Sequence, residues 1–113
     1  MSPKRIQQKR VKGWRMPENA VSVCRPGRWG NPFQIGSTNW IPVDSSGTWS
    51  KEPHPPLTRE QAIQCFRYCT EFDLQQNPAY LEPLRGKDLA CFCPPNVDCH
   101  ADVLLELANK ETP

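Results

Sequence analysis

The sequence predicts a small single-domain α/β fold: a parallel or mixed, Rossmann-like sheet with helices packed on it and a long irregular insertion. Two short apolar segments typical of strands, residues 19–24 and 88–93, are each followed along the chain by an amphipathic helix. The chain has 113 residues, which is enough for about one domain. Ligands bind to such sheets where strand ends meet helix starts, so we expect the site there.

The first half of the chain contains one predicted strand and little other regular structure. Residues 19–24 alternate in polarity and include two valines, which is typical of a short strand. Residues 25–33 contain two prolines and two glycines and therefore predict a shaped loop. Residues 38–57 are expected to be a variable insertion or linker, with a short hairpin edge over 40–43 that turns at 44–47.

The second half predicts a helix, a strand and a second helix. Residues 58–61 fit a capping box, which places a helix start there and its end near Gln75. One face of that helix is apolar at helical spacing, at Ala62, Cys65, Phe66, Cys69 and Phe72. Residues 88–93 are almost continuously apolar, which favours a central strand of a parallel sheet. Either Asp98 or Cys99 then caps a final helix.

The net charge of +2 conceals an asymmetry. Residues 1–17 carry six bases and no acid, whereas the rest carry eight bases and twelve acids. We expect residues 1–18 to be a basic arm that contacts phosphates, on a single α/β domain over 19–110; a solvated terminus is the alternative. Nucleotide, nucleic acid or a host protein are candidate partners, and the oligomeric state stays open.

Two absences from the sequence bear on location. No segment approaches the apolar length of a membrane span, and the N-terminus lacks the apolar stretch of a secretory leader. We therefore expect no membrane partner and a cytoplasmic location, which is the host cytoplasm if a phage encodes the protein. In a reducing compartment, six cysteines favour metal binding, catalysis or burial over a disulfide framework.

The informative cysteines are Cys91, Cys93 and Cys99, followed directly by His100. Together they offer the four ligands of a tetrahedral zinc site, so zinc is a candidate cofactor. Alternatively, Cys99 in the first turn of a helix is a reactive thiolate, with His100 as its base and Asp102 as the orienting group. In a third interpretation the three cysteines only pack and His100 forms a local hydrogen bond. The sequence leaves all three open.

The loop over residues 25–33 supplies candidate ligand-binding residues: Arg25, Arg28, Trp29, Gly30, Asn31 and Phe33. Arginine side chains donate in the geometry that phosphate and carboxylate accept, and glycine permits close approach of the backbone. Trp29 or Phe33 can stack on a base. The alternative is a rigid turn, with Phe33 in the core and the arginines in solvent.

These motifs resemble the domain-of-unknown-function family numbered 4326, found in phages and bacteria. The similarity covers about residues 5–109 and is carried by KGWRMPEN (12–19), RPGRWGNPF (25–33), LRGKDLACFCP (84–94) and CHADVL (99–104). The resemblance implies that the marked positions are Arg25, Gly30, Asn31, Pro32, Phe33, Cys91, Cys93, Cys99, His100 and Asp102. Cys24 departs from the family pattern, which often has glycine at this position. The C-terminal block is also similar to another uncharacterised α/β family.

We predict one site, formed by loop 25–33 and the strand–helix junction at 93–102. It is expected to bind a nucleotide or nucleic-acid-related anionic ligand, and whether it also processes this ligand stays open. If the protein is an enzyme, we expect a cysteine-dependent transferase or hydrolase with Cys99 as nucleophile. The alternative is a zinc-stabilised, non-catalytic binding module, for example a phage accessory protein acting on a host factor or DNA.

Overall fold

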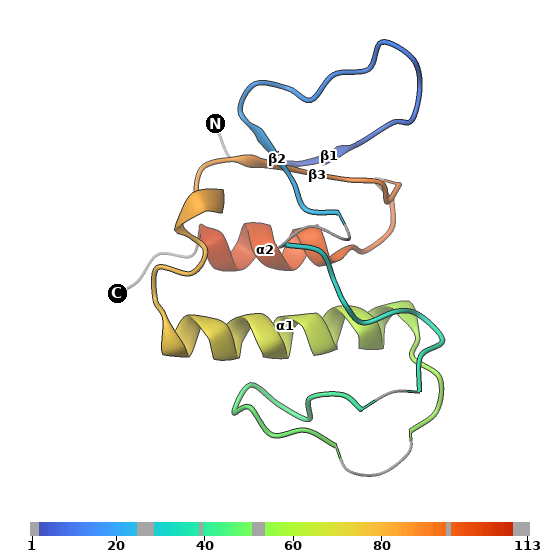
Figure 1. Ribbon diagram of the computed structural model, residues 1–113, viewed down its shortest axis with the longest axis vertical. Helices are drawn as coiled ribbons and strands as arrows, with labels where there is room; N and C mark the ends of the chain where they lie inside the picture. Colours follow the sequence, from blue (N-terminus) through green and yellow to red (C-terminus); the bar gives the residue numbers. More distant parts are fainter. Residues whose placement is uncertain (1–2, 25–28, 39, 51–53, 95, 110–113) are drawn as a thin grey trace. The chain divides into compact units, whose positions relative to one another are not determined.

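The computed structural model describes residues 3–24, 29–38, 40–50, 54–94 and 96–109. Along the chain the elements are β1 (Arg5–Gln7), β2 (Ala20–Ser22), α1 (Arg59–Gln76), the 3-10 helix η1 (Glu82–Leu84), β3 (Asp88–Cys91) and α2 (His100–Ala108) (Figure 1). The chain divides into two compact units. Unit 1 consists of Met1–Gly30 with Leu81–Pro113, and unit 2 of Asn31–Tyr80.

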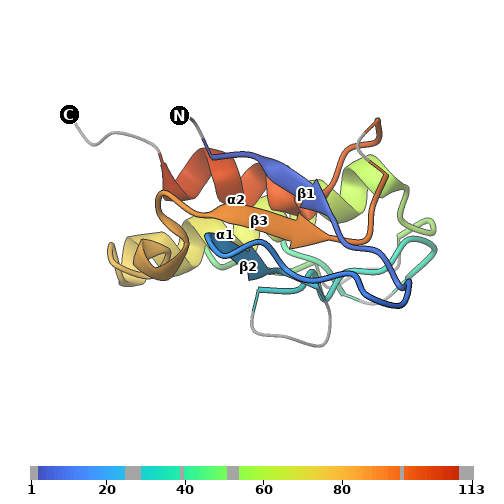
Figure 2. The same cartoon turned by 90° about the horizontal axis from the view of Figure 1, so that it is seen from above.

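Unit 1 contains a three-stranded parallel sheet in which β3 lies between β1 and β2 (Figure 2). In the register of the sheet, Leu89 of β3 lies opposite Arg5 on one side and Val21 on the other. Leu89 and Ala90 are completely buried, as expected of the central strand of a parallel sheet. The predicted α/β class with a parallel sheet is therefore confirmed.

The strand β1 differs from the sequence-based expectation for residues 1–18. Part of this segment, predicted as a basic arm, is an edge strand of the sheet. Its backbone joins β3 through hydrogen bonds from Leu89 N to Lys4 O (3.0 Å) and from Gln8 N to Cys91 O (2.6 Å). The pattern was missed because Arg5–Gln7 contains one apolar residue between two polar ones, which is too short to show an alternation.

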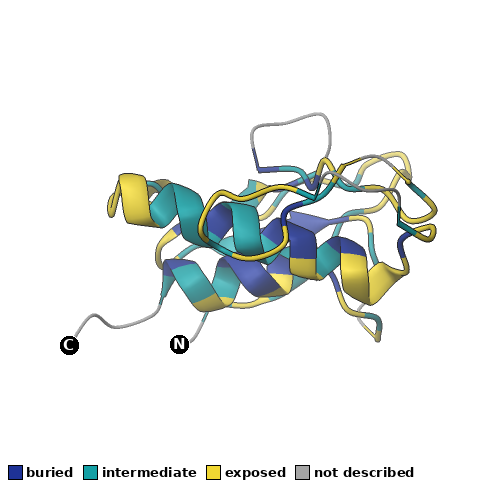
Figure 3. Ribbon diagram, turned by 90° about the horizontal axis from the view of Figure 1, so that it is seen from below, coloured by how far each residue is buried: buried dark blue, intermediate teal, exposed yellow. Residues whose placement is uncertain are grey.

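Helix α2 contacts both β3 and β1 of the sheet. It buries Ala101, Val103, Leu104 and Ala108, while other positions on the helix stay exposed (Figure 3). This stripe at three- and four-residue spacing is why the segment is helical and why one face packs against the sheet. Leu104 joins Val23, Leu84 and Leu89 among the most completely buried side chains.

Unit 2 contains α1, which begins at the predicted capping box. Gln61 N donates to Thr58 Oγ1 (3.2 Å), and Thr58 N donates to Gln61 Oε1 (3.0 Å). A small core beside the helix start consists of Leu57, Ala62 and Cys65, with Phe33 and Ile41 packed against it. Among the helices that the structure describes, none combines the length and apolar character needed to cross a bilayer.

Residues 41–50 form a hairpin edge within the predicted insertion. Pro42 and Trp49 form an isolated antiparallel bridge, and Val43 N donates to Thr48 O (3.0 Å). The turn contains Gly47 at φ +89°, a left-handed conformation that side chains with a Cβ rarely adopt. A Cβ at this position would lie 2.7 Å from the Phe72 ring.

We expect Gly47→Ala to destabilise the protein more than Gly36→Ala. Gly36 has the same left-handed φ, +88°, but no heavy atom within 4 Å of its Cβ position. Each variant should lose about 1–2 kcal/mol from backbone strain, and Gly47→Ala about 1 kcal/mol or more in addition from crowding against Phe72. Urea unfolding measures both. Equal losses would show that Phe72 does not hold this turn.

Candidate metal centre at the strand–helix junction

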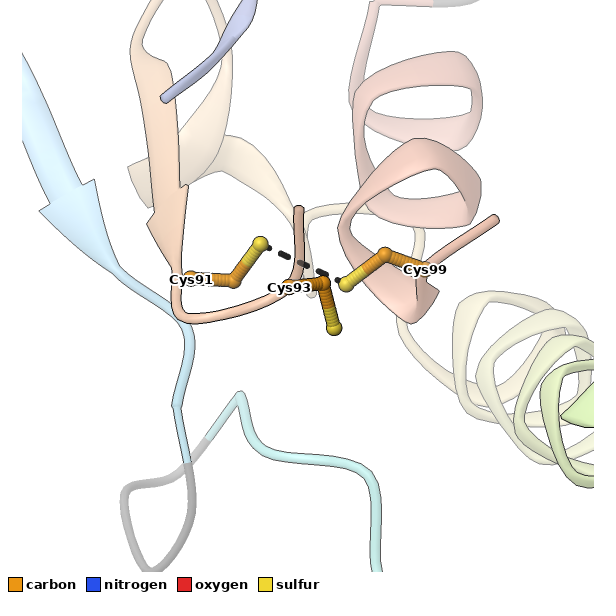
Figure 4. A group of neighbouring side chains, drawn as sticks. All are labelled: Cys91, Cys93 and Cys99. Carbon is orange, nitrogen blue, oxygen red and sulfur yellow. Dashed lines mark hydrogen bonds between the residues drawn. The ribbon is translucent and has the colours of Figure 1, made fainter. Parts of the chain in front are cut away.

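Three cysteines meet where β3 ends and α2 begins (Figure 4). Cys91 is the last residue of β3, Cys93 lies in the turn that follows, and Cys99 is the N-cap of α2. Their Sγ atoms all lie within 4.8 Å of one another. The chain must reverse between β3 and α2 for the helix to pack on the sheet, and this reversal brings Cys99 back to Cys91.

The sulfur spacing fits a tetrahedral metal site. Zinc–sulfur bonds of about 2.3 Å place two thiolates on one ion about 3.8 Å apart, and a thiolate and an imidazole nitrogen about 3.5 Å apart. In the structure, Cys99 Sγ lies 3.4 Å from Cys91 Sγ and 3.5 Å from His100 Nδ1. These two contacts are close to the corresponding edges of a zinc tetrahedron, whereas His100 lies beside the three-cysteine group and would have to move toward Cys91 and Cys93 to join it as a ligand.

Cys91 and Cys99 are in direct sulfur–sulfur contact. Their Sγ atoms lie 3.4 Å apart, within hydrogen-bond distance, and this contact lowers the pKa of Cys99 well below its usual range. His100 and the backbone N–H of Ala101 lower it further. The same contact raises the pKa of Cys91, as does burial. The lowered pKa of Cys99 favours its thiolate, which is the form that binds a metal or acts as a nucleophile.

His100 presents its Nδ1 atom to the cluster, because its other nitrogen has a fixed partner. Nε2 lies 2.6 Å from the carbonyl oxygen of Val23. A carbonyl only accepts, so Nε2 carries the proton and donates it. Nδ1 faces Cys99 Sγ at 3.5 Å, where it offers a lone pair to a metal if the ring is neutral and donates to the sulfur if the ring is an imidazolium. Histidine ligands of metals characteristically donate their second ring N–H to a carbonyl or carboxylate in this way.

Asp102 contacts the backbone at the start of α2 and the side chain of Arg5, and its predicted role in orienting His100 stays a prediction. Its Oδ2 accepts from Cys99 N (3.1 Å) and from the guanidinium of Arg5 (3.0 Å). The carboxylate thus caps α2 and forms an ion pair with β1. Arg5 also donates to the carbonyl of Pro94 (3.1 Å), within the turn that carries Cys93. Arg5 could not be predicted as a site residue because it lies on strand β1, which has no local sequence signal.

All six cysteines are free thiols, and three of them lie outside the cluster. Cys65 and Cys69 belong to α1, where we predicted that they pack as small apolar residues. Burial raises the pKa of Cys65, and it raises that of Cys69 to about 11. Cys24 is half-buried and donates to Gln8 Oε1 (3.0 Å). These thiols serve as internal references for the reactivity of the cluster.

Comparison with known proteins assigns the family. The family described as "Domain of unknown function (DUF4326)" matches residues 6–110. The chain belongs to this family. No curated protein and no solved structure shows significant similarity to it. The family description names no activity, so the chemistry of this DUF4326 protein is argued from the cluster itself.

The predicted ligand-binding loop of the DUF4326 domain is only partly described. Arg25 and Arg28 lie outside the described residues. Trp29 belongs to unit 1 and is buried, with 9% of its surface exposed, and Gly30 is half-buried. The predicted convergence of this loop on the residues around Cys99 stays a prediction.

The other two predicted ligand-binding residues, Asn31 and Phe33, belong to unit 2. The Asn31 amide donates to Ala62 O (3.3 Å) and accepts from Phe33 N (2.8 Å), so it holds the local backbone. Phe33 packs against the core beside Leu57, which is the alternative considered for it, and its ring lies 6.0 Å from that of Trp49.

We expect Arg5→Gln to lower the free energy of unfolding by about 1–2 kcal/mol, because it removes charge-assisted hydrogen bonds to a half-exposed carboxylate. The matched control is Arg85→Gln, which breaks an exposed ion pair with Glu82 at 3.7 Å. That change should cost less than about 0.5 kcal/mol. Urea unfolding compares the two, and similar small losses would show that Arg5 does not hold the junction.

Proposed function

We propose that the protein is a zinc-stabilised binding module in which Cys91, Cys93, Cys99 and His100 hold one Zn²⁺. One observation carries the proposal: three sulfurs lie within 4.8 Å of one another, beside an imidazole whose Nε2 donates to a carbonyl and whose Nδ1 faces Cys99. Thiolate and imidazole ligands together favour zinc over magnesium or calcium.

The ligand set supports a structural role for the ion. Four protein ligands fill the tetrahedron, whereas catalytic zinc keeps one position open for water or substrate. Cys91 and Cys99 are almost completely buried, which also limits access of a substrate to the centre. A metal is consistent with the size of unit 1, whose sheet has strands of only three or four residues. Small domains commonly need such a cross-link because their cores are limited.

The thiolate ligands bear on location. Zinc–thiolate centres persist where thiols stay reduced, as in a cytoplasm. The proposal is therefore consistent with the cytoplasmic location expected from the sequence.

Zinc removal tests the proposal. We expect one zinc per chain by elemental analysis, and a lower melting temperature after treatment with a chelator. Cys93→Ser should abolish stoichiometric zinc, because it removes a ligand from a half-buried position with little disturbance of the core. Cys69→Ser is the control, since Cys69 lies on α1 outside the cluster, and it should keep the metal. Metal-free protein with a chelator-insensitive melt would refute the proposal.

Thiolate chemistry at Cys99 is the second candidate function, as a transferase or hydrolase acting on a nucleotide-type substrate. The lowered pKa of Cys99 and its position at the start of α2 favour this alternative. Its burial argues against it, because only 2% of the residue is exposed. A nucleophile needs a path to its substrate.

Alkylation with iodoacetamide separates the two candidates. If zinc is bound, Cys93 and Cys99 should be alkylated slowly until a chelator is added, because metal-bound sulfur is protected. Peptide mass spectrometry follows each cysteine. Cys24 is the internal control, and its rate should not respond to the chelator. Alkylation of Cys99 faster than free cysteine, without chelator, would instead support the catalytic thiolate.

We infer that the ligand of this module is anionic and of the nucleotide or nucleic-acid class. Basic side chains of the N-terminal segment support this inference, because Lys9, Arg10, Lys12 and Arg15 are all exposed. Exposed bases that are not neutralised by acids attract phosphates.

A further inference from the structure

The loop between β1 and β2, residues 8–19, is the most basic surface of unit 1 that the structure describes. It contains four exposed bases, Lys9, Arg10, Lys12 and Arg15, and one acid, Glu18. Within the described part of the chain, no ion pair neutralises any of the four bases. The loop extends beyond the strands that it connects (Figure 1). Its charge is therefore available to a ligand.

The loop has an ordered turn that presents one of these charges. Trp14 N donates to Val11 O (3.2 Å), and Gly13 adopts a left-handed φ of +88°. Lys12 lies between Val11 and Gly13 in this turn and is exposed. The stem of the loop is anchored to the sheet by the hydrogen bond from Gln8 N to Cys91 O. A fixed turn orders its charges before a ligand binds, which lowers the entropic cost of binding.

An aromatic ring lies beneath the loop. The guanidinium carbon of Arg10 lies 4.3 Å from the centre of the Phe92 ring, and Phe92 is 39% exposed between the ligand candidates Cys91 and Cys93. The exposed ring presents an aromatic surface to solvent beside the Arg10 guanidinium. Arginine and phenylalanine side chains are two of the surfaces on which unpaired bases stack.

We propose that the β1–β2 loop and Phe92 bind single-stranded nucleic acid. Phosphates contact Lys9, Lys12 and Arg15, and one base stacks on the pair formed by Arg10 and Phe92. A single strand fits better than a duplex, because the base faces of a duplex are stacked on one another and are not accessible for stacking on the Phe92 ring. The inference specifies the anionic ligand of the proposed function, and it does not depend on which metal the cysteines hold.

Fluorescence anisotropy with labelled oligo(dT) and oligo(U) tests the proposal on the full chain. Oligonucleotides of about 12 nucleotides cover the usual site sizes. The logarithm of the binding constant should fall with the logarithm of salt concentration, with a slope of about −0.7 for each phosphate contacted. Lys12→Gln should make this slope shallower by about that amount. Arg85→Gln, which removes one exposed charge elsewhere in unit 1, should leave it unchanged.

Phe92→Leu separates stacking from charge. It keeps an apolar side chain and all charges, so it should weaken binding several-fold while leaving the salt slope unchanged. Equal affinity for a duplex of the same length, or for polyglutamate, would overturn the proposal, as would a Phe92→Leu variant that binds like the parent protein. Failure to bind any oligonucleotide at low salt would do the same. Zinc content and melting temperature of the same sample test the metal centre, so the two proposals can fail separately.

Discussion

The reversal of the chain between β3 and α2 is the constraint on which the rest of unit 1 depends. β3 is the central strand, and the amphipathic helix that follows must turn back to cover the sheet. The turn is closed by the contact between Cys91 and Cys99, whose sulfurs lie 3.4 Å apart. The packing requirement of the fold and the assembly of the cysteine cluster therefore have one cause. A change in this turn affects both.

The first turn of α2 is connected to every strand of the sheet. Asp102 forms an ion pair with Arg5 on β1, Cys99 contacts Cys91 on β3, and His100 donates to the carbonyl of Val23, the residue directly after β2. These three contacts differ in chemistry but converge on one helix end. In the proposed metal-bound form, the ion would strengthen the last two contacts. The β1–β2 loop contacts Phe92, which lies between Cys91 and Cys93. The proposed binding surface for nucleic acid therefore adjoins the part of unit 1 in which these contacts converge.

The regular elements that could be predicted are those with a strong local signal. The capping box at Thr58 places the start of α1, and the apolar segment ending at Cys91 predicts a central parallel strand. β1 has no such signal, because a three-residue edge strand with one apolar residue is held by its backbone hydrogen bonds to β3. The roles of Arg5 and Asp102 could not be predicted for the same reason, since their ion pair joins residues 97 positions apart.

The sequence by itself determined the family, the α/β class and the candidate ligand set, because motif spacing, helix caps and hydrophobic periodicity are local properties of the chain. Only the tertiary structure decided how those ligands meet. The register of the sheet and the return of α2 bring Cys99 to Cys91 and direct Nδ1 of His100 toward them. The carbonyl of Val23 selects the tautomer of that ring. Such contacts depend on which distant segments pack together, and residue spacing alone does not specify that.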